Sequence, residues 1–235
     1  MTLPVVLFLG VLGLWILAPY GIRRLSERAL DRRCRAARVL VLSYDDGPGQ
    51  TLTGRLLDLL ARHGAQATFF VLGRNIAASP GLPAALAAAG HEVGSHSAMH
   101  RNAWKSEPFG VWTDVRAGRD QLARAGIRTR LFRPPYGKLT LAGLLQGWVD
   151  GLVFGWWTVD SRDVWAPRAM DEVVEEVRAR RGGVVLMHDY DSPGSPPEHG
   201  DYVIELTEKL LTMASEEGLR VRTLGQLLSK EAVRD

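Results

Sequence analysis

The chain has 235 residues, of which 46% are hydrophobic, enough to bury one substantial core. The formal net charge of +3 is concentrated locally: seven arginines and two acids between residues 23 and 38 contribute +5, which leaves about −2 for residues 39–235. Nucleic-acid binding is therefore disfavoured, because the main domain has no excess of positive charge.

The first predicted element is a hydrophobic segment. Residues 3–22 carry no charge, and twenty residues in a helix match the hydrocarbon core of a bilayer. A cleaved signal peptide is the alternative, but it should begin with Lys or Arg and end at a small-residue cleavage site. We therefore predict a single-pass membrane anchor over residues 1–22 and an arginine-rich juxtamembrane segment over residues 23–38. By the positive-inside rule, these arginines favour a cytoplasmic main domain.

After residue 38, apolar extended runs alternate with helical patterns, as in repeated βα units. Seven strands are predicted, at residues 39–44, 67–72, 91–95, 129–132, 151–159, 183–187 and 220–222. Six helices are predicted between them, at residues 52–63, 83–89, 109–125, 139–148, 169–180 and 202–217. Such units form an open doubly wound sheet or a barrel, and both collect functional side chains at the carboxyl ends of the strands.

Polar side chains follow five of the predicted strands. They include Asp45 and Asp46, His96 and His100, Arg133, Asp160, and His188. Neighbours on an extended strand point to opposite faces, so Asp45 and Asp46 can act separately, one on a metal and one on a proton. The i, i+4 spacing of His96 and His100 would place both imidazoles on one side of a helical turn, where they and one carboxylate could bind an ion. A helix cap and a surface histidine are the alternative reading of this pair.

Five motifs resemble, in order, those of the polysaccharide deacetylases of the NodB-homology group, carbohydrate esterase family four. They are Asp-Asp-Gly-Pro at 45–48, His-Ser-x-x-His at 96–100, Arg-Pro-Pro-Tyr-Gly at 133–137, Asp-Ser-Arg-Asp-Val-Trp at 160–165 and Leu-x-His at 186–188. The fourth departs from the family pattern by one extra residue before Trp165. The resemblance implies an α/β fold, a distorted (β/α)7-type barrel with its catalytic domain over residues 39–230, preceded here by the predicted transmembrane helix.

The resemblance also implies the metal site and the base. Asp46, His96 and His100 would bind a divalent metal, most simply Zn²⁺, with Co²⁺ or Ni²⁺ as alternatives. Asp45 would be the general base that takes a proton from water, and Arg133 would orient it. Without the family, pairing of Arg133 with a structural carboxylate is the alternative.

Further roles are implied for residues of the later motifs. His188 would be the general acid, with Asp160 as its partner and Asp189 as the rival partner. Asp163 is expected to serve its loop, and His199 to lie on the surface.

The acyl group would be held by three residues. The resemblance implies that the backbone N–H of Tyr136 donates to the oxyanion and that Leu186 lines the acyl pocket. Trp165 would form a wall of that pocket, which its shifted position puts in question. An ordinary turn is the alternative for the segment around Tyr136.

The predicted function is metal-dependent removal of an acetyl or similar small acyl group from an amino sugar of a polysaccharide, oligosaccharide or lipid-linked glycan. A glycosidase with paired acids is one alternative, and an inactive carbohydrate-binding or envelope scaffold on the same fold is the other. The expected partners are a glycan and, through the anchor, a membrane, with no nucleic acid. The family favours an extracytoplasmic domain, whereas the arginines favour a cytoplasmic one. The sequence leaves the sugar, the acyl group and the oligomeric state open.

Overall fold

The computed structural model of the chain describes residues 3–191 and 198–229. Its helices are α1 (Leu3–Ala37), α2 (Leu52–Arg62), α3 (Gly73–Ile76), α4 (Leu82–Ala88), α5 (Pro108–Arg124), α6 (Leu141–Val149), α7 (Met170–Arg180), α8 (His199–Glu216) and α9 (Leu224–Leu228). Its strands are β1 (Val39–Asp45), β2 (Thr68–Val71), β3 (Glu92–Ser95), β4 (Leu131–Phe132), β5 (Val153–Phe154), β6 (Val159–Asp160), β7 (Gly183–His188) and β8 (Arg220–Val221). A short 3-10 helix, η1, spans Pro135–Gly137.

The eight strands form one parallel sheet around β1. Their order is β5-β4-β3-β2-β1-β7-β6, and β8 pairs with the first residues of β1. In this register Asp45 at the end of β1 lies beside His188 at the end of β7, and Ser95 at the end of β3 lies beside Phe132. Because all the strands run in the same direction, the segments that follow them meet at one edge of the sheet.

The sheet curls, but no hydrogen-bonded pairing of its two end strands closes it into a full barrel among the described residues. Among the described residues, β5 and β6 lie at opposite ends of the sheet order and do not pair. The prediction of one strand over residues 151–159 is therefore wrong, because residues 155–158 cross from one end of the sheet to the other. The buried guanidinium of Arg133 holds this crossing by donating to the carbonyls of Gly155 (3.1 Å) and Trp156 (3.3 Å).

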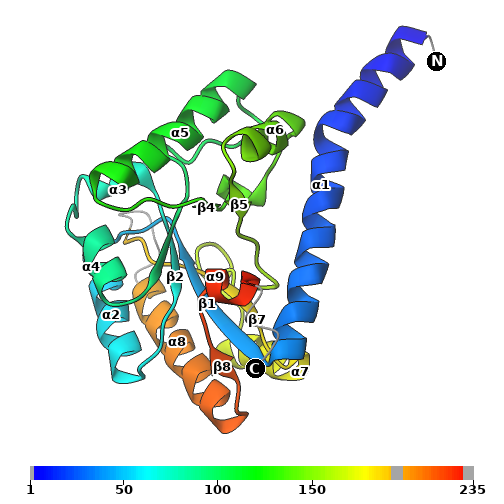
Figure 1. The fold of residues 1–235 in the computed structure, drawn as a ribbon. Coiled ribbons are helices and arrows are strands. Elements are labelled where there is room, and N and C mark those ends of the chain that lie inside the picture. Colours follow the sequence, from blue (N-terminus) through cyan, green and yellow to red (C-terminus); the bar gives the residue numbers. More distant parts are fainter. Residues whose placement is uncertain (1–2, 192–197, 230–235) are drawn as a thin grey trace.

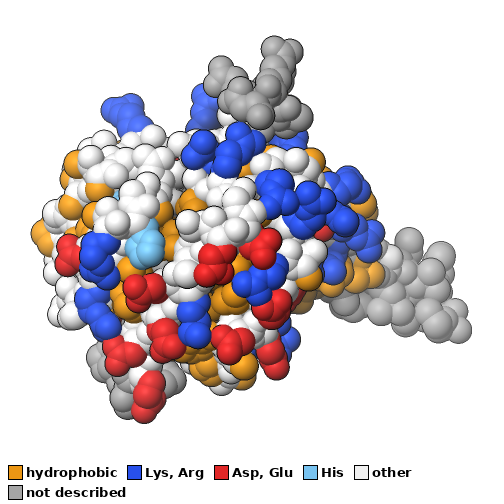
Figure 2. All heavy atoms as spheres, turned by 90° about the horizontal axis from the view of Figure 1, so that it is seen from below, with side chains coloured by type: hydrophobic (Ala, Val, Ile, Leu, Met, Phe, Trp, Pro, Cys, Tyr) orange, Lys and Arg blue, Asp and Glu red, His pale blue; other side chains and the backbone are white. Residues whose placement is uncertain are grey.

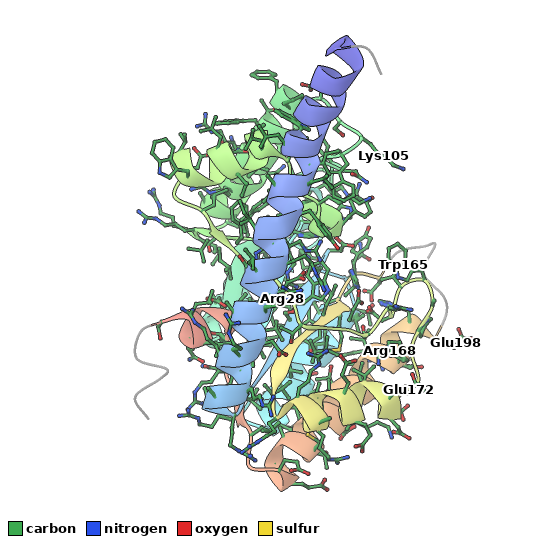
Figure 3. The ribbon with its side chains drawn as sticks, turned by 90° about the vertical axis from the view of Figure 1, so that its right-hand side faces the viewer. Arg28, Lys105, Trp165, Arg168, Glu172 and Glu198 are labelled. Atoms are coloured by element: carbon green, nitrogen blue, oxygen red, sulfur yellow. The ribbon has the colours of Figure 1, made fainter. Side chains whose placement is uncertain are left out.

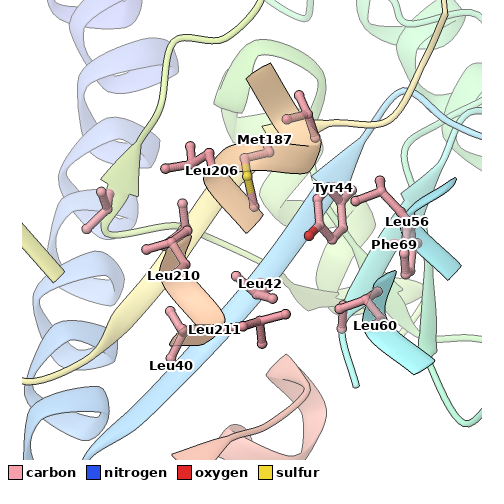
Figure 4. Close-up of a cluster of buried hydrophobic side chains, with 14 of the residues drawn as sticks. Leu40, Leu42, Tyr44, Leu56, Leu60, Phe69, Met187, Leu206, Leu210 and Leu211 are labelled. Atoms are coloured by element: carbon pink, nitrogen blue, oxygen red, sulfur yellow. The ribbon is translucent and has the colours of Figure 1, made fainter. Parts of the chain in front are cut away.

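Two hydrophobic clusters cover the two faces of β1. Leu40, Leu42 and Tyr44 point toward α2 and α8, where they pack with buried leucines of both helices (Figure 4). Val39 and Val41 point to the other face, because side chains alternate along a strand. Ser43 and Asp45 lie on the same face of β1 as Val39 and Val41. Asp45 therefore points into the interior at the end of the strand. A side-chain hydrogen bond from Arg133 reaches both Ser43 and Asp45.

Helix α1 runs without interruption through the two segments that the sequence separates. Its N-terminal end lies away from the sheet, whereas its second half lies against it (Figure 1). Leu30 and Cys34 of this half are buried in the second cluster, together with Val184 of β7. The docked half of α1 is thus part of the hydrophobic core.

A membrane-spanning anchor over residues 3–22 is not supported. No helix of the described residues is both long enough and apolar enough to cross a membrane. Instead of ending at Ile22, α1 continues through the arginine-rich segment to Ala37. Figure 2 shows the charges on one face of the molecule: Lys and Arg side chains gather on one side, while acidic and basic side chains mix over the middle.

Candidate functional site

Three potential metal ligands meet at the carboxyl edge of the sheet. Asp46 follows β1, and His96 and His100 follow β3. One ligand atom of each lies within 4.8 Å of the others. The Nε2 atoms of His96 and His100 lie 3.5 Å and 3.3 Å from Oδ1 of Asp46. The structure therefore brings together the three residues predicted as metal ligands.

The spacing of the two histidines led us to expect a helical turn, but the structure has none there. Ser97 and His100 have positive φ values of 71° and 59°, so the segment folds as a tight irregular loop. Asp114 of α5 holds this loop, because its backbone carbonyl accepts from Ala98 N–H at 3.1 Å and its carboxylate accepts from Met99 N–H at 2.7 Å. Asp114 is a buried supporting residue that the sequence did not single out, since nothing in α5 marks it as facing the loop.

The chemistry of these three side chains fits a divalent cation. Nδ1 of His96 lies 2.8 Å from the carbonyl oxygen of Arg133, to which it donates in the tautomer that leaves Nε2 free to bind a metal. Burial lowers the pKa of His96 to about 3 and also lowers the pKa of His100, so both imidazoles are neutral ligands at pH 7. Oδ1 of Asp46 is buried and has no hydrogen-bond partner among the described residues. Two imidazole nitrogens and one carboxylate oxygen suit Zn²⁺ with open positions.

Asp45 forms a buried ion pair with Arg133. Nη1 of Arg133 donates to Oδ1 of Asp45 at 2.7 Å and to Oγ of Ser43 at 3.0 Å. The arginine is 0% exposed and Asp45 is 3% exposed, so the pair is shielded from water. The second oxygen, Oδ2, lies 3.7 Å from Nε2 of His96 and faces the metal ligands. Burial raises the pKa of Asp45 above its usual range, and the charges of Arg133 and His188 offset this only in part.

The partner of His188 is Asp163, not Asp160. Nδ1 and the backbone N–H of His188 contact the two carboxylate oxygens of Asp163 at 2.9 Å and 2.8 Å. His199 contacts the same carboxylate through Nε2 at 3.1 Å, and it is 4% exposed, so its predicted surface position is also wrong. Burial alone would lower the pKa of His188, but the charge and hydrogen bond of Asp163 raise it to about 10. The two histidines hold the pKa of Asp163 well below its usual range against the effect of burial.

The two expected partners of His188 have other contacts. Oδ1 of Asp160 accepts from the backbone N–H of Arg162 at 2.9 Å. Asp189 accepts from Gly47 N–H at 3.1 Å and from Thr53 Oγ1 at 2.6 Å, and so supports the turn after Asp46. The fourth motif contains two aspartates three residues apart, and only the fold decides which of them faces the histidine.

The turn after β4 places the ring of Tyr136 against His100. Tyr136 has a φ of 57°, a left-handed conformation that is uncommon for a residue with a side chain. Its ring packs on His100, with 4.5 Å between the ring centroids. None of the hydrogen bonds found among the described residues uses the N–H of Tyr136. This donor is therefore unused by the part of the chain that the structure describes.

The two predicted acyl-pocket residues differ in position. Leu186 on β7 is buried, 5% exposed, and follows the same face of its strand as His188. Trp165 is 76% exposed and lies on the surface in the loop after β6 (Figure 3). The structure therefore does not pack Trp165 against the residues of the site.

Known proteins match this chain in sequence over most of its length. The family model described as polysaccharide deacetylase matches residues 32–144. A chitooligosaccharide deacetylase from Bradyrhizobium sp. (strain ANU 289) is 34% identical over 199 residues, which cover 81% of this chain and 90% of that relative.

Solved structures resemble the fold over most of the chain. The crystal structure of a peptidoglycan N-acetylglucosamine deacetylase has a TM-score of 0.73 and 28% identity, covering 81% of this chain and 87% of its own. A family four pseudoenzyme from Bacillus anthracis has a TM-score of 0.70 and 23% identity, covering 82% of this chain and 66% of its own. At that identity the second likeness concerns the fold alone.

Proposed function

The chain belongs to the polysaccharide deacetylase family of hydrolases, and on that premise we propose that it removes an acetyl, or similarly small acyl, group from an amino sugar. The substrate would be a polysaccharide, an oligosaccharide or a lipid-linked glycan. One observation carries the proposal: the three ligand atoms of Asp46, His96 and His100 lie within 4.8 Å of one another, with a buried base beside them and an acid on the neighbouring strand.

The proposed metal would be held by Asp46, His96 and His100, with Zn²⁺ as the ion that best suits this donor set. A divalent cation supplies Lewis-acid activation of water and of the acyl carbonyl. The chain itself supplies the proton transfers and the remaining hydrogen bonds. The proton transfers depend on two pairs of side chains, Asp45 with Arg133 and His188 with Asp163.

Asp45 would accept the proton of the attacking water through Oδ2. Its other oxygen, Oδ1, is occupied by Arg133 at 2.7 Å, so the ion pair fixes the carboxylate and leaves one oxygen toward the metal ligands. The raised pKa of the buried carboxyl makes it a better proton acceptor than an exposed aspartate.

His188 would protonate the leaving amine or alcohol through Nε2, because Nδ1 is bonded to Asp163. The raised pKa keeps the imidazole protonated at neutral pH, as a general acid requires. The backbone N–H of Tyr136 would stabilise the negative charge that develops on the acyl oxygen.

A test measures acetate release from N-acetylated chitooligosaccharides by the zinc-loaded protein. We expect turnover that chelation abolishes and zinc restores. Asp45→Asn should retain zinc and lose at least about 100-fold in kcat, whereas His96→Ala should lose the metal itself. Unchanged turnover in Asp45→Asn would contradict the mechanism.

An inactive scaffold is the second candidate, because one structure with this fold is a pseudoenzyme. It predicts glycan binding without acetate release from chitooligosaccharides or peptidoglycan fragments, even with zinc bound. The intact base, acid and ligand set argues against it. A glycosidase would instead release reducing ends and retain activity after chelation.

The compartment of the catalytic domain is part of this proposal, since it selects the substrate. An exported domain would meet peptidoglycan or exopolysaccharide, and a cytoplasmic one an oligosaccharide or a lipid-linked precursor. A compartment-sensitive reporter fused after Asp235 would separate the two. Our proposal, on family grounds, is an extracytoplasmic domain, and reporter activity confined to the cytoplasm would overturn it.

A further inference from the structure

The guanidinium of Arg23 reaches from α1 to the turn that contains Tyr136. Its Nη1 donates to the backbone carbonyl of Gly137, 114 residues away in the chain. Its Nε donates to Glu27 at 2.7 Å, one helical turn further along α1. Its plane lies over the ring of Trp157, with 4.6 Å from the guanidinium carbon to the ring centroid. Arg23 is thus fixed by an acid, an aromatic ring and a carbonyl oxygen.

The turn that Arg23 contacts has an unusual backbone. Tyr136 and Gly137 have consecutive positive φ values of 57° and 61°. Such a conformation costs free energy for a tyrosine and persists only where the surroundings enforce it. A Cβ atom added to Gly137 would collide with the guanidinium of Arg23 and with Trp157, so the packing against the turn is close.

The turn is therefore held from two sides. On one side the ring of Tyr136 packs on His100, a proposed metal ligand, with centroids 4.5 Å apart. On the other side Arg23 binds the carbonyl of Gly137. The N–H of Tyr136 comes just before both contacts along the backbone, in the peptide that joins Pro135 to Tyr136. A change in the backbone dihedrals of Tyr136 or Gly137, which the two contacts restrain, would change its direction.

The same contacts reach the general base. Two arginines lie over the ring of Trp157, with the guanidinium carbon of Arg23 at 4.6 Å and that of Arg133 at 5.4 Å from its centroid. Arg133 in turn binds Asp45. Glu27, which is 8% exposed, also accepts from Arg24 at 2.6 Å. The carboxylate of Glu27 therefore offsets the positive charge of Arg23 close to Arg133.

We propose that Arg23 is a positioning residue for deacetylation, which binds Gly137 and thereby aims the Tyr136 N–H at the developing oxyanion. This makes α1 a part of the active site, although Arg23 lies before residue 32, where the match to the family model begins. The inference rests on the proposed function, because it assigns a role within that reaction.

The kinetic test compares Arg23→Met with Arg24→Gln. Both variants remove one arginine contact to Glu27, but only Arg23 touches the turn. We expect Arg23→Met to lower kcat between about 10- and 100-fold with KM within about 3-fold, because a misaimed donor weakens binding of the transition state more than that of the substrate. Arg24→Gln should stay within about 2-fold of the unmodified protein, and Arg23→Lys should recover part of the loss by restoring a cationic donor.

A second measurement does not depend on activity. The chain has five tyrosines, so selective ¹⁵N-tyrosine labelling gives few amide signals, and Tyr136→Phe identifies the one that matters. In the metal-free protein, Arg23→Met should shift or broaden the Tyr136 amide signal, whereas Arg24→Gln should not. If Arg23→Met fails to fold, Arg23→Lys provides both measurements.

The outcomes separate this inference from the proposed function. An unmodified protein without acetate release would overturn the proposed function. An active protein whose Arg23→Met variant keeps its kcat and its Tyr136 signal would overturn the role of Arg23 alone. A loss confined to KM, or a parallel loss of bound zinc, would also contradict it.

Discussion

Asp163 accepts hydrogen bonds from His188 and His199, and its charge raises the pKa of His188, the proposed general acid. The Asp163→Asn variant removes the charge that raises the pKa of His188. We expect the alkaline limb of the kcat/KM profile to move to lower pH, and the rate at pH 8 to fall between about 10- and 100-fold. Asp160→Asn is the matched control and should change the rate less than about 3-fold. A larger loss in Asp160→Asn would restore Asp160 as the partner.

The contact between His188 and Asp163 should also affect the stability of the fold. The folded pKa of His188, about 10, lies above the ordinary value of about 6.5 expected in the unfolded chain. The stabilisation from the protonated histidine is therefore complete below about pH 6.5 and disappears as the pH rises toward 10. Urea unfolding of the metal-free protein should show the difference between the unmodified chain and His188→Gln shrinking over this interval. A difference that grows with pH would contradict the assignment.

At the scale of elements, helix α5 approaches the metal-ligand loop closely at one glycine. A Cβ atom added to Gly118 would lie 2.8 Å from the backbone N of Ala98, and would meet the backbone of Ser97 even more closely. Gly118→Ala should therefore destabilise the protein by about 1–3 kcal/mol and weaken zinc binding, because the loop has to shift. Thermal unfolding and zinc titration measure the two effects.

Gly54 of α2 provides the control for this substitution. An added Cβ at Gly54 meets nothing within 4 Å, so Gly54→Ala should be neutral or stabilising by up to about 1 kcal/mol. Equal effects of the two substitutions would show that the approach of α5 to the loop does not matter.

The elements themselves were largely predictable from periodicity. The structure confirms the long helices and the parallel strands, because apolar runs and helical spacing record which faces are buried. The failure lies at residues 151–159, where an apolar run reads as one strand. The backbone there leaves the sheet because Arg133 supplies hydrogen bonds to Gly155 and Trp156, and a contact so distant in sequence leaves no local pattern.

At the level of the whole molecule, the second half of α1 is part of the hydrophobic core. Cys34, the only cysteine, is 0% exposed between this helix and the sheet, and burial raises the pKa of its thiol to about 12. A thiol reagent at pH 8 should therefore label less than about 10% of the native protein in minutes, and all of it in denaturant. Rapid labelling of the native protein would mean that α1 is not docked.

The strand pattern was enough to predict which polar residues meet at the edge of the sheet. Asp45, Asp46, His96, His100 and Arg133 converge as predicted, because parallel strands deliver whatever follows them to the same edge. The expectation that they meet needs only the strand pattern and the residue types, whereas the role of each residue came from the family resemblance.

Which of these groups pair, and what surrounds them, depends on contacts between distant segments. His188 pairs with Asp163 and not with Asp160. His199 contacts the same carboxylate, and Asp114 contacts the loop of the metal ligands. Arg23 contacts the turn that contains Tyr136. Helix α1 also runs through two segments that composition alone divided into a membrane anchor and an arginine-rich juxtamembrane segment. The physical reason is the same in each case: hydrogen bonds and packing between distant segments depend on side-chain direction in three dimensions, which no local spacing records.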